Sequence, residues 1–215
     1  MIASFALFDI ANFVTPAKRV APPLLIVAIA AIITPWPTFA IGAAAIVMSL
    51  LAANPFAADE RGRLDTLYAT LPLSRSAVVI GRYVSLTVIY LLVVLAANIL
   101  AVAVPLTKGA EIDLWMLGMI NLASVIIYAL AIAVQLPFFF SVGFTRARPM
   151  MYIPVGVVAG LLWLAGQTGL VDDSDFTALQ SIDPVVAVGV GVGVSVVALV
   201  ISAAVSSVRY GRRSL

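Results

Sequence analysis

The sequence contains neither cysteine nor histidine among its 215 residues. Disulfide bonds, thiol catalysis and the usual zinc sites are therefore excluded. Charge is scarce as well, because Asp, Glu, Lys and Arg make up 10% of the chain, against about 25% in a soluble domain. A membrane-embedded enzyme is disfavoured, since almost no nucleophile–base pair or metal site can be built without histidine, cysteine or intramembrane carboxylates.

What fills the chain instead is apolar: 63% of the residues are hydrophobic, in runs of about fifteen to twenty-five. Each run can cross or nearly cross a hydrocarbon layer of ~30 Å. The alternating segments of a β-barrel are missing, so helices must satisfy the backbone in lipid. We predict an all-α, polytopic membrane protein with one transmembrane domain over residues 1–215. Its six transmembrane helices are expected at residues 20–34, 38–53, 77–104, 114–142, 150–169 and 185–208.

The first nineteen residues do not resemble a cleaved signal peptide, because Asp9 is present and no basic residue precedes Lys18. Phe5, Phe8 and Phe13 can form one apolar side of a helix. This pattern predicts an interfacial helix over residues 1–19 that lies on the inner membrane surface. A frayed start of the first transmembrane helix is the alternative.

The basic residues mark the side on which each loop lies. Eleven of the twelve fall in alternate gaps between the predicted helices, and only Lys108 falls in the others, together with six of the ten acids. Basic residues near transmembrane ends stay cytoplasmic. We therefore predict cytoplasmic N- and C-termini, a cytoplasmic loop at 54–79 and an extracytoplasmic loop at 170–184, in the inner (cytoplasmic) membrane. Topology accounts for the basic residues, so the net charge of +2 does not indicate a nucleic-acid partner.

The predicted helices have no ionisable residue in their interiors, which disfavours proton coupling. Their clearest polar residues are Asn98, Asn121 and Gln135. Each could line a translocation path, or each could form an interhelical hydrogen bond of roughly 0.6–2 kcal/mol. We favour the hydrogen bond for each one singly.

The charged loop at 54–79 stands out between two apolar runs. Pro55 is expected to end the second transmembrane helix, and a short amphipathic helix is expected from Asp59, with Leu64, Leu67 and Leu71 on its apolar side. Pro72 stops this helix, and Ser74 is placed to cap the next one. Anionic headgroups would repel the acids of this loop, which favours a protein partner over a lipid anchor.

The loop resembles the first cytoplasmic loop of the ABC-2 type permease family. The residues that carry the resemblance are Asp59-Glu60, Asp65, Leu71-Pro72-Leu73-Ser74-Arg75 and Gly81-Arg82-Tyr83. They are similar to an acidic residue before a short helix, an L-P-(V/I/L)-S-R turn and a G-(K/R)-Y start of the third helix. The layout is closest to the small six-span permeases of peptide exporters such as the phenol-soluble modulin exporter. Gly62 departs from this pattern, because it weakens the short helix by roughly 1 kcal/mol relative to Ala.

The resemblance implies a permease subunit of an ABC exporter that couples to a separate ATPase subunit and moves an amphipathic peptide or other hydrophobic compound outward. A second permease copy, identical or not, would complete the path. The chain would have no catalytic residue, no metal and no cofactor of its own, since the partner ATPase would bind ATP and magnesium. The residues implied in coupling are Asp59, Glu60, Arg61, Leu64, Asp65, Leu67, Leu71, Pro72, Leu73, Ser74 and Arg75. A non-transporting membrane immunity or scaffold protein is the alternative function.

Overall fold

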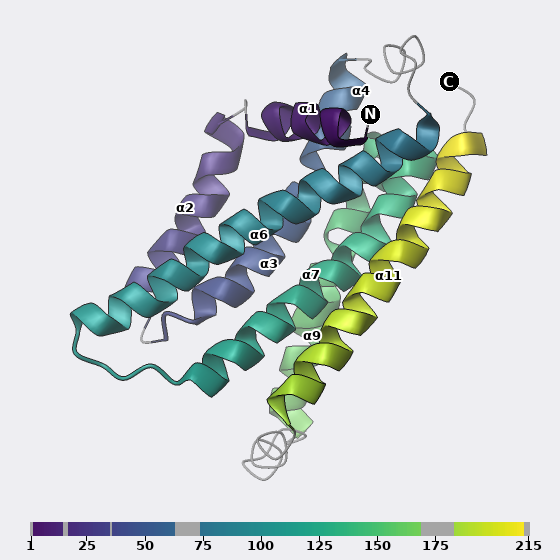
Figure 1. Ribbon diagram of the computed structural model, residues 1–215. Helices are drawn as coiled ribbons and strands as arrows, with labels where there is room; N and C mark the ends of the chain where they lie inside the picture. Colours follow the sequence, from purple (N-terminus) through teal and green to yellow (C-terminus); the bar gives the residue numbers. More distant parts are fainter. Residues whose placement is uncertain (1, 15–16, 35, 63–73, 169–182, 213–215) are drawn as a thin grey trace.

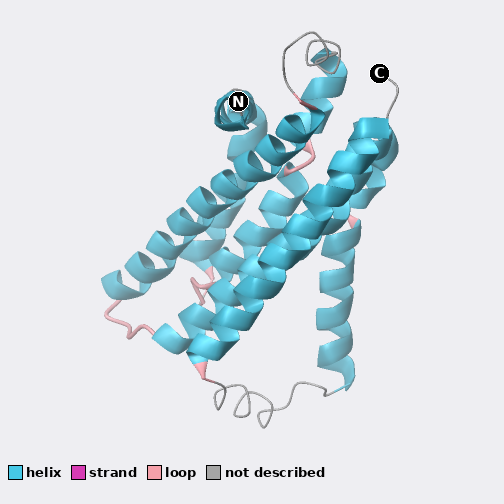
Figure 2. Ribbon diagram, turned by 45° about the vertical axis from the view of Figure 1, so that its right-hand side comes forward, coloured by secondary structure: helices cyan, strands magenta, loops and turns pink. Residues whose placement is uncertain are grey.

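The computed structural model describes residues 2–14, 17–34, 36–62, 74–168 and 183–212. Within these ranges the chain is helical and has no strand, which confirms the all-α prediction for the described residues (Figure 2). The helices are α1 (Ile2–Val14), α2 (Ala17–Ile33), α3 (Phe39–Leu51), α4 (Asn54–Gly62), α6 (Arg75–Thr107), α7 (Leu114–Val142), α8 (Phe144–Ala147), the 3₁₀ helix η1 (Arg148–Met151), α9 (Ile153–Thr168) and α11 (Pro184–Arg212).

The helices α2, α3, α6, α7, α9 and α11 run along one bundle in alternating directions (Figure 1). The short helix α1 lies across one end, and α4 and both chain termini lie at that same end. We call it the basic end, because it holds the elements that carry Arg61, Arg75, Arg146, Arg209 and Arg212. The opposite end holds the turn with Lys108 and the start of α11.

Four segments of the described chain are long and apolar enough to cross a membrane: Phe39–Gly62, Arg75–Thr107, Leu114–Val142 and Pro184–Arg212. Within α2 the shorter stretch Leu24–Ile33 is also apolar. The chain is thus an integral membrane protein by composition and helix length. Crossings by α2 and α9, which would complete the six expected ones, stay a prediction, as does the cytoplasmic side of the termini.

The junction between α3 and α4 differs from the prediction. Pro55 was expected to end helix and Asp59 to begin the next one, but α4 already starts at Asn54. The physical reason is that proline fits the first turn of a helix, where its missing N–H has no partner to lose. Asp59, which is half-buried, and Glu60, which is exposed, therefore lie in the second turn of α4.

Ser74 caps α6 as expected. Its side chain accepts a hydrogen bond from the backbone N–H of Ala77 at 3.2 Å, and its own backbone is extended. From this cap α6 continues to Thr107, three residues beyond the predicted end, with Pro105 in its last turn. The cap fixes where the long helix begins at the basic end.

Hydrogen bonds between helices lie close to Pro137, near the C-terminal end of α7. Proline has no N–H, so the carbonyl of Ala133 loses its bond partner one turn on. Ser202 of α11 donates to that carbonyl at 2.7 Å, and the Tyr83 hydroxyl of α6 lies 2.6 Å from the Ser202 hydroxyl. Because the Ser202 hydroxyl donates its single proton to the carbonyl of Ala133, the Tyr83 hydroxyl must be the donor in its bond to Ser202. The three longest helices are thus joined at one level.

Candidate functional site

The face of α1 that meets the bundle repeats every four residues. Phe5, Asp9 and Phe13 are buried, whereas Phe8 is exposed. A helix over residues 2–14 confirms the helical part of the prediction, but the three phenylalanines do not share one side, because Phe8 is exposed and Asp9 is buried between Phe5 and Phe13. The reason is electrostatic, since a cation lies beneath α1 to receive that carboxylate.

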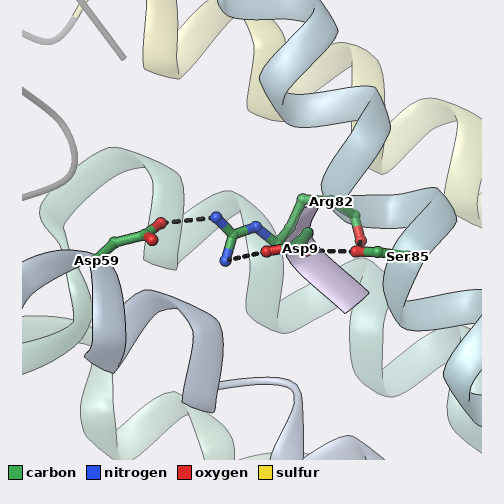
Figure 3. A network of polar contacts seen from close by, with 4 residues as sticks. All are labelled: Asp9, Asp59, Arg82 and Ser85. Atoms are coloured by element: carbon green, nitrogen blue, oxygen red, sulfur yellow. Dashed lines mark hydrogen bonds and ion pairs between the residues drawn. The ribbon is translucent and has the colours of Figure 1, made fainter. Parts of the chain in front are cut away.

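The cation is Arg82 of α6, whose side chain is 1% exposed. Its Nη1 lies 3.2 Å from Asp9 Oδ1, and its Nη2 lies 2.6 Å from Asp59 Oδ2 (Figure 3). The side chains of Asp9 and Asp59 are 3% and 14% exposed. Ser85, one turn on from Arg82, donates a hydrogen bond to the Asp9 carboxylate. One guanidinium therefore joins α1, α4 and α6, and we call Asp9, Arg82 and Asp59 the arginine clamp.

Arginine suits this position because its planar fork can reach two carboxylates with two different nitrogens, which a lysine ammonium cannot match. Two aromatic rings add to its surroundings, since the guanidinium carbon lies 5.7 Å from the centroid of Phe5 and 4.9 Å from that of Phe56. Burial raises the pKa of Asp9 above its ordinary value, although Arg82 and the hydrogen bond from Ser85 act to lower it. The Asp9 carboxyl group is thus kept beside Arg82 although burial removes it from water.

Glu60, the next residue of α4, contacts a different element. Its Oε2 accepts a hydrogen bond from the backbone N–H of Thr145 at 2.9 Å. Thr145 lies in the first turn of α8, which follows Gly143, where φ is +80°. That left-handed conformation favours glycine and lets α8 begin at the residue directly after Gly143, where α7 has ended. Neighbouring acids of α4 therefore connect the loop to two different parts of the bundle.

Arg75 connects the start of α6 to the end of α11. Its Nη1 donates to the carbonyls of Tyr210 and Gly211 at 3.0 Å each, and its guanidinium carbon lies 6.0 Å from the Tyr210 ring centroid. The last carbonyls of a helix lack intrahelical partners and carry partial negative charge, so an arginine there is favourable. Arg75 was predicted to take part in coupling, and the structure places its side chain against the end of α11.

Of the other predicted coupling residues, Arg61 is exposed on the last turn of α4. Six lie outside the described residues: Leu64, Asp65, Leu67, Leu71, Pro72 and Leu73. The contact of this loop with an ATPase stays a prediction.

The three intramembrane amides all form interhelical hydrogen bonds. Asn98 of α6 and Asn121 of α7 donate to each other's side-chain oxygen, both at 2.8 Å. Gln135 is buried, and its Nε2 donates to the carbonyl of Met151 at 3.2 Å. This arrangement agrees with the interpretation that we favoured for each amide singly. A role in a translocation path stays a prediction.

Sequence reasoning missed the clamp, because it assigned Arg82 to membrane topology and did not pair it with any acid. The available signal was position. Arg82 lies seven residues into a helix that starts at Arg75, too deep for a simple interfacial charge, and both Asp9 and Asp59 are acids on the predicted cytoplasmic side, where anionic headgroups would repel them.

A bundle of long apolar helices, closed at one end by a helix lying across it and by paired charges, defines an integral membrane protein with one charged end. Residues 10–210 match the family described as ABC-2 family transporter protein. The chain therefore belongs to the ABC-2 transporter family, as its first charged loop predicted. A search of curated proteins found no significant match. Membership makes the chain a membrane component of a transporter and implies an ABC ATPase partner in general. Likeness to peptide exporter permeases stays a prediction.

Proposed function

We propose that this chain is the permease subunit of an ABC exporter and that a separate ATPase subunit docks at the basic end of the bundle. The observation that carries the proposal is the family match over residues 10–210, nearly the whole chain. In this proposal the chain sits in the cytoplasmic membrane with the basic end inside. ATP and magnesium are bound by the partner, and the permease performs no chemistry.

The arrangement of α4 supports the site of docking. Asp59 is half-buried against Arg82, and Glu60, although exposed, accepts a hydrogen bond from the backbone of Thr145, while Arg61 is exposed on the last turn. A partner that meets α4 would therefore touch Arg61 and the segment that follows it. We assign Arg61 the role of direct contact with an acidic patch of the ATPase, while Asp59 and Glu60 hold the helix in place.

The cargo that we propose is an amphipathic peptide or another hydrophobic compound. The three intramembrane amides already have partners within the chain. The surface groove between α6 and α11, about 290 Å³, is lined by apolar side chains such as Val84, Val88 and Leu199. Neither feature suits a sugar or another strongly polar cargo. A second permease copy would supply the other wall of the path.

The test is copurification followed by transport. The tagged permease is expressed with the ABC ATPase encoded beside it, as wild type, Arg61→Glu and Lys108→Glu. Lys108 is the matched control, because it is an exposed cation at the opposite end of the bundle. We expect wild type and Lys108→Glu to retain the ATPase and Arg61→Glu to lose most of it. ATP-dependent uptake of a fluorescent amphipathic peptide into inside-out vesicles then establishes outward transport.

Two results would contradict the proposal. If the wild type retains no ATPase while remaining in the membrane, the chain does not act with that ATPase, and the immunity or scaffold function becomes the better explanation. If the complex forms but accumulates cargo only in right-side-out vesicles, the transporter is an importer.

A further inference from the structure

Among the residues that the structure describes, the buried charged side chains are Asp9 and Arg82, both members of the arginine clamp. Its three members come from α1, α4 and α6, and they are brought together although residues 9, 59 and 82 are far apart in the sequence (Figure 3). A buried arginine that loses one of its carboxylates leaves charge without compensation, which is strongly unfavourable in a low-dielectric setting. The three helices should therefore keep their contact or part completely, rather than slide by small steps.

We propose that the arginine clamp makes α1, α4 and the first turns of α6 one mechanical unit, in which Asp9, Arg82 and Asp59 are positioning residues for coupling. Asp59 acts inside the chain and does not touch the ATPase. A displacement imposed on α4 then moves α1 along the membrane surface and tilts α6 at the same time. This role in transport rests on the proposed function, but the mechanical unit itself can be measured on the permease alone.

The geometry supports a link that runs through α1. Asp9 is joined to α6 twice, by the ion pair with Arg82 and by the hydrogen bond from Ser85. Phe5 of α1 and Phe56 of α4 both lie near the same guanidinium, so that aromatic contacts as well as charge connect it to these two helices. An ordinary interfacial helix needs only an apolar side toward lipid. The buried Asp9 is explained better by a contact that must persist during movement.

The first experiment measures hydrogen exchange of the α1 amides in the purified permease without any partner. The variants are Arg82→Met and Asp59→Asn, and the control is Arg209→Met, the same change at an exposed arginine of the basic end that lies over Phe138 instead. We expect exchange in α1 to become at least about tenfold faster in both clamp variants and to stay at the wild-type rate in Arg209→Met. Unchanged exchange in α1 of both clamp variants would overturn the proposal.

The second experiment separates positioning from direct contact, using the complex with the ATPase. Asp9→Asn is decisive here, because Asp9 is buried beneath α1 and cannot reach a partner. We expect Asp9→Asn and Asp59→Asn to keep the ATPase bound and hydrolysing while the peptide transported per ATP falls severalfold. Arg82→Lys keeps the positive charge but loses the planar guanidinium. It should transport more peptide per ATP than Arg82→Met and less than wild type.

The outcomes of this second experiment are distinct. Loss of the ATPase in Asp59→Asn with normal transport in Asp9→Asn would show that Asp59 is itself a docking residue, and the proposal would be wrong. If the wild type binds no ATPase at all, the proposed function fails, while the exchange rates of α1 still decide whether the clamp holds the three helices together. If Arg82→Met does not fold, the exchange of Asp9→Asn takes its place in the first experiment.

Discussion

The pair formed by Asn98 and Asn121 gives the sharpest test of whether polar groups in the bundle hold helices together or line a path. Each amide donates to the other's oxygen at 2.8 Å and also to a carbonyl of its own helix, Val94 or Leu117, at 2.9 Å. Replacing either residue with leucine removes both interhelical bonds and leaves the other amide without its cross-helix partner. The double variant removes both groups together, so we expect it to cost less than the sum of the singles.

The magnitude follows from two bonds. Interhelical hydrogen bonds in membrane proteins average about 0.6 kcal/mol and reach about 1.7 kcal/mol, so the coupling energy between Asn98 and Asn121 should be about 1–3 kcal/mol. The assay is a double-mutant cycle on the free energy of unfolding in mixed micelles, with helicity followed against the detergent fraction. Ser141→Ala paired with Asn98→Leu is the control, because Ser141 bonds only to its own helix, at Phe138, and should show no coupling.

Transport separates the two interpretations. If the amides only join α6 to α7, the double leucine variant should carry cargo at close to the wild-type rate once it is folded. A coupling energy near zero, together with lost transport in single variants of normal stability, would refute the structural interpretation and place Asn98 and Asn121 on the path.

Three further predictions concern single positions. Ser74→Ala should lower the free energy of unfolding by about 1 kcal/mol, measured in the same micelles, because the cap of α6 is lost; an unchanged value would contradict the cap. Gly191→Ala should be less stable than Gly189→Ala by about 1 kcal/mol, since the methyl added at 191 would lie 2.5 Å from Leu122 Cδ1 and force that side chain to move, whereas the methyl added at 189 meets open space. Burial raises the pKa of Asp9 above 3.8, so protonation of Asp9 favours the folded state, and this contribution is complete below pH 3.8 and is lost as pH rises through the folded-state pKa, where the ion pair with Arg82 remains. The stability advantage of wild type over Asp9→Asn should therefore shrink from acidic to neutral pH, and a widening gap would contradict this sign.

Sequence pattern predicted the long helices well because their signal is local. The expected bounds of α7, 114–142, agree with the structure, and the cap at Ser74 was found from residue type and position alone. The start of a helix next to a proline was harder to predict. Pro55 stops a helix that arrives from its N-terminal side but fits the first turn of a new one, and only the packing of α4 against the bundle decides between these outcomes.

The candidate site was predicted only in part, because its contacts join distant residues. A charged loop indicated docking, and Asp59, Glu60 and Arg75 were all singled out. What periodicity could not show is which of these charges has a partner within the chain. Asp59 meets a cation 23 residues away and Arg75 meets carbonyls 135 and 136 residues away. These distances in sequence lie beyond the reach of helical spacing, so the outward face of α4 could not be told from its inward face.

The distribution of contacts along the bundle bears on how such a permease would move. At the basic end the Phe56 ring lies 5.1 Å from that of Phe139 and 4.9 Å from that of Phe140, so α4 is fixed to α7 by aromatic packing as well as to α6 by the clamp. At the opposite end Asp113 and Asp183 accept hydrogen bonds from the starts of their own helices, at Met116 and Val185. Those bonds set where α7 and α11 begin and do not join one helix to another. A force applied to α4 should therefore turn the basic end as one body, whereas a separation of α6 from α7 toward the opposite end would also have to break the two hydrogen bonds between Asn98 and Asn121.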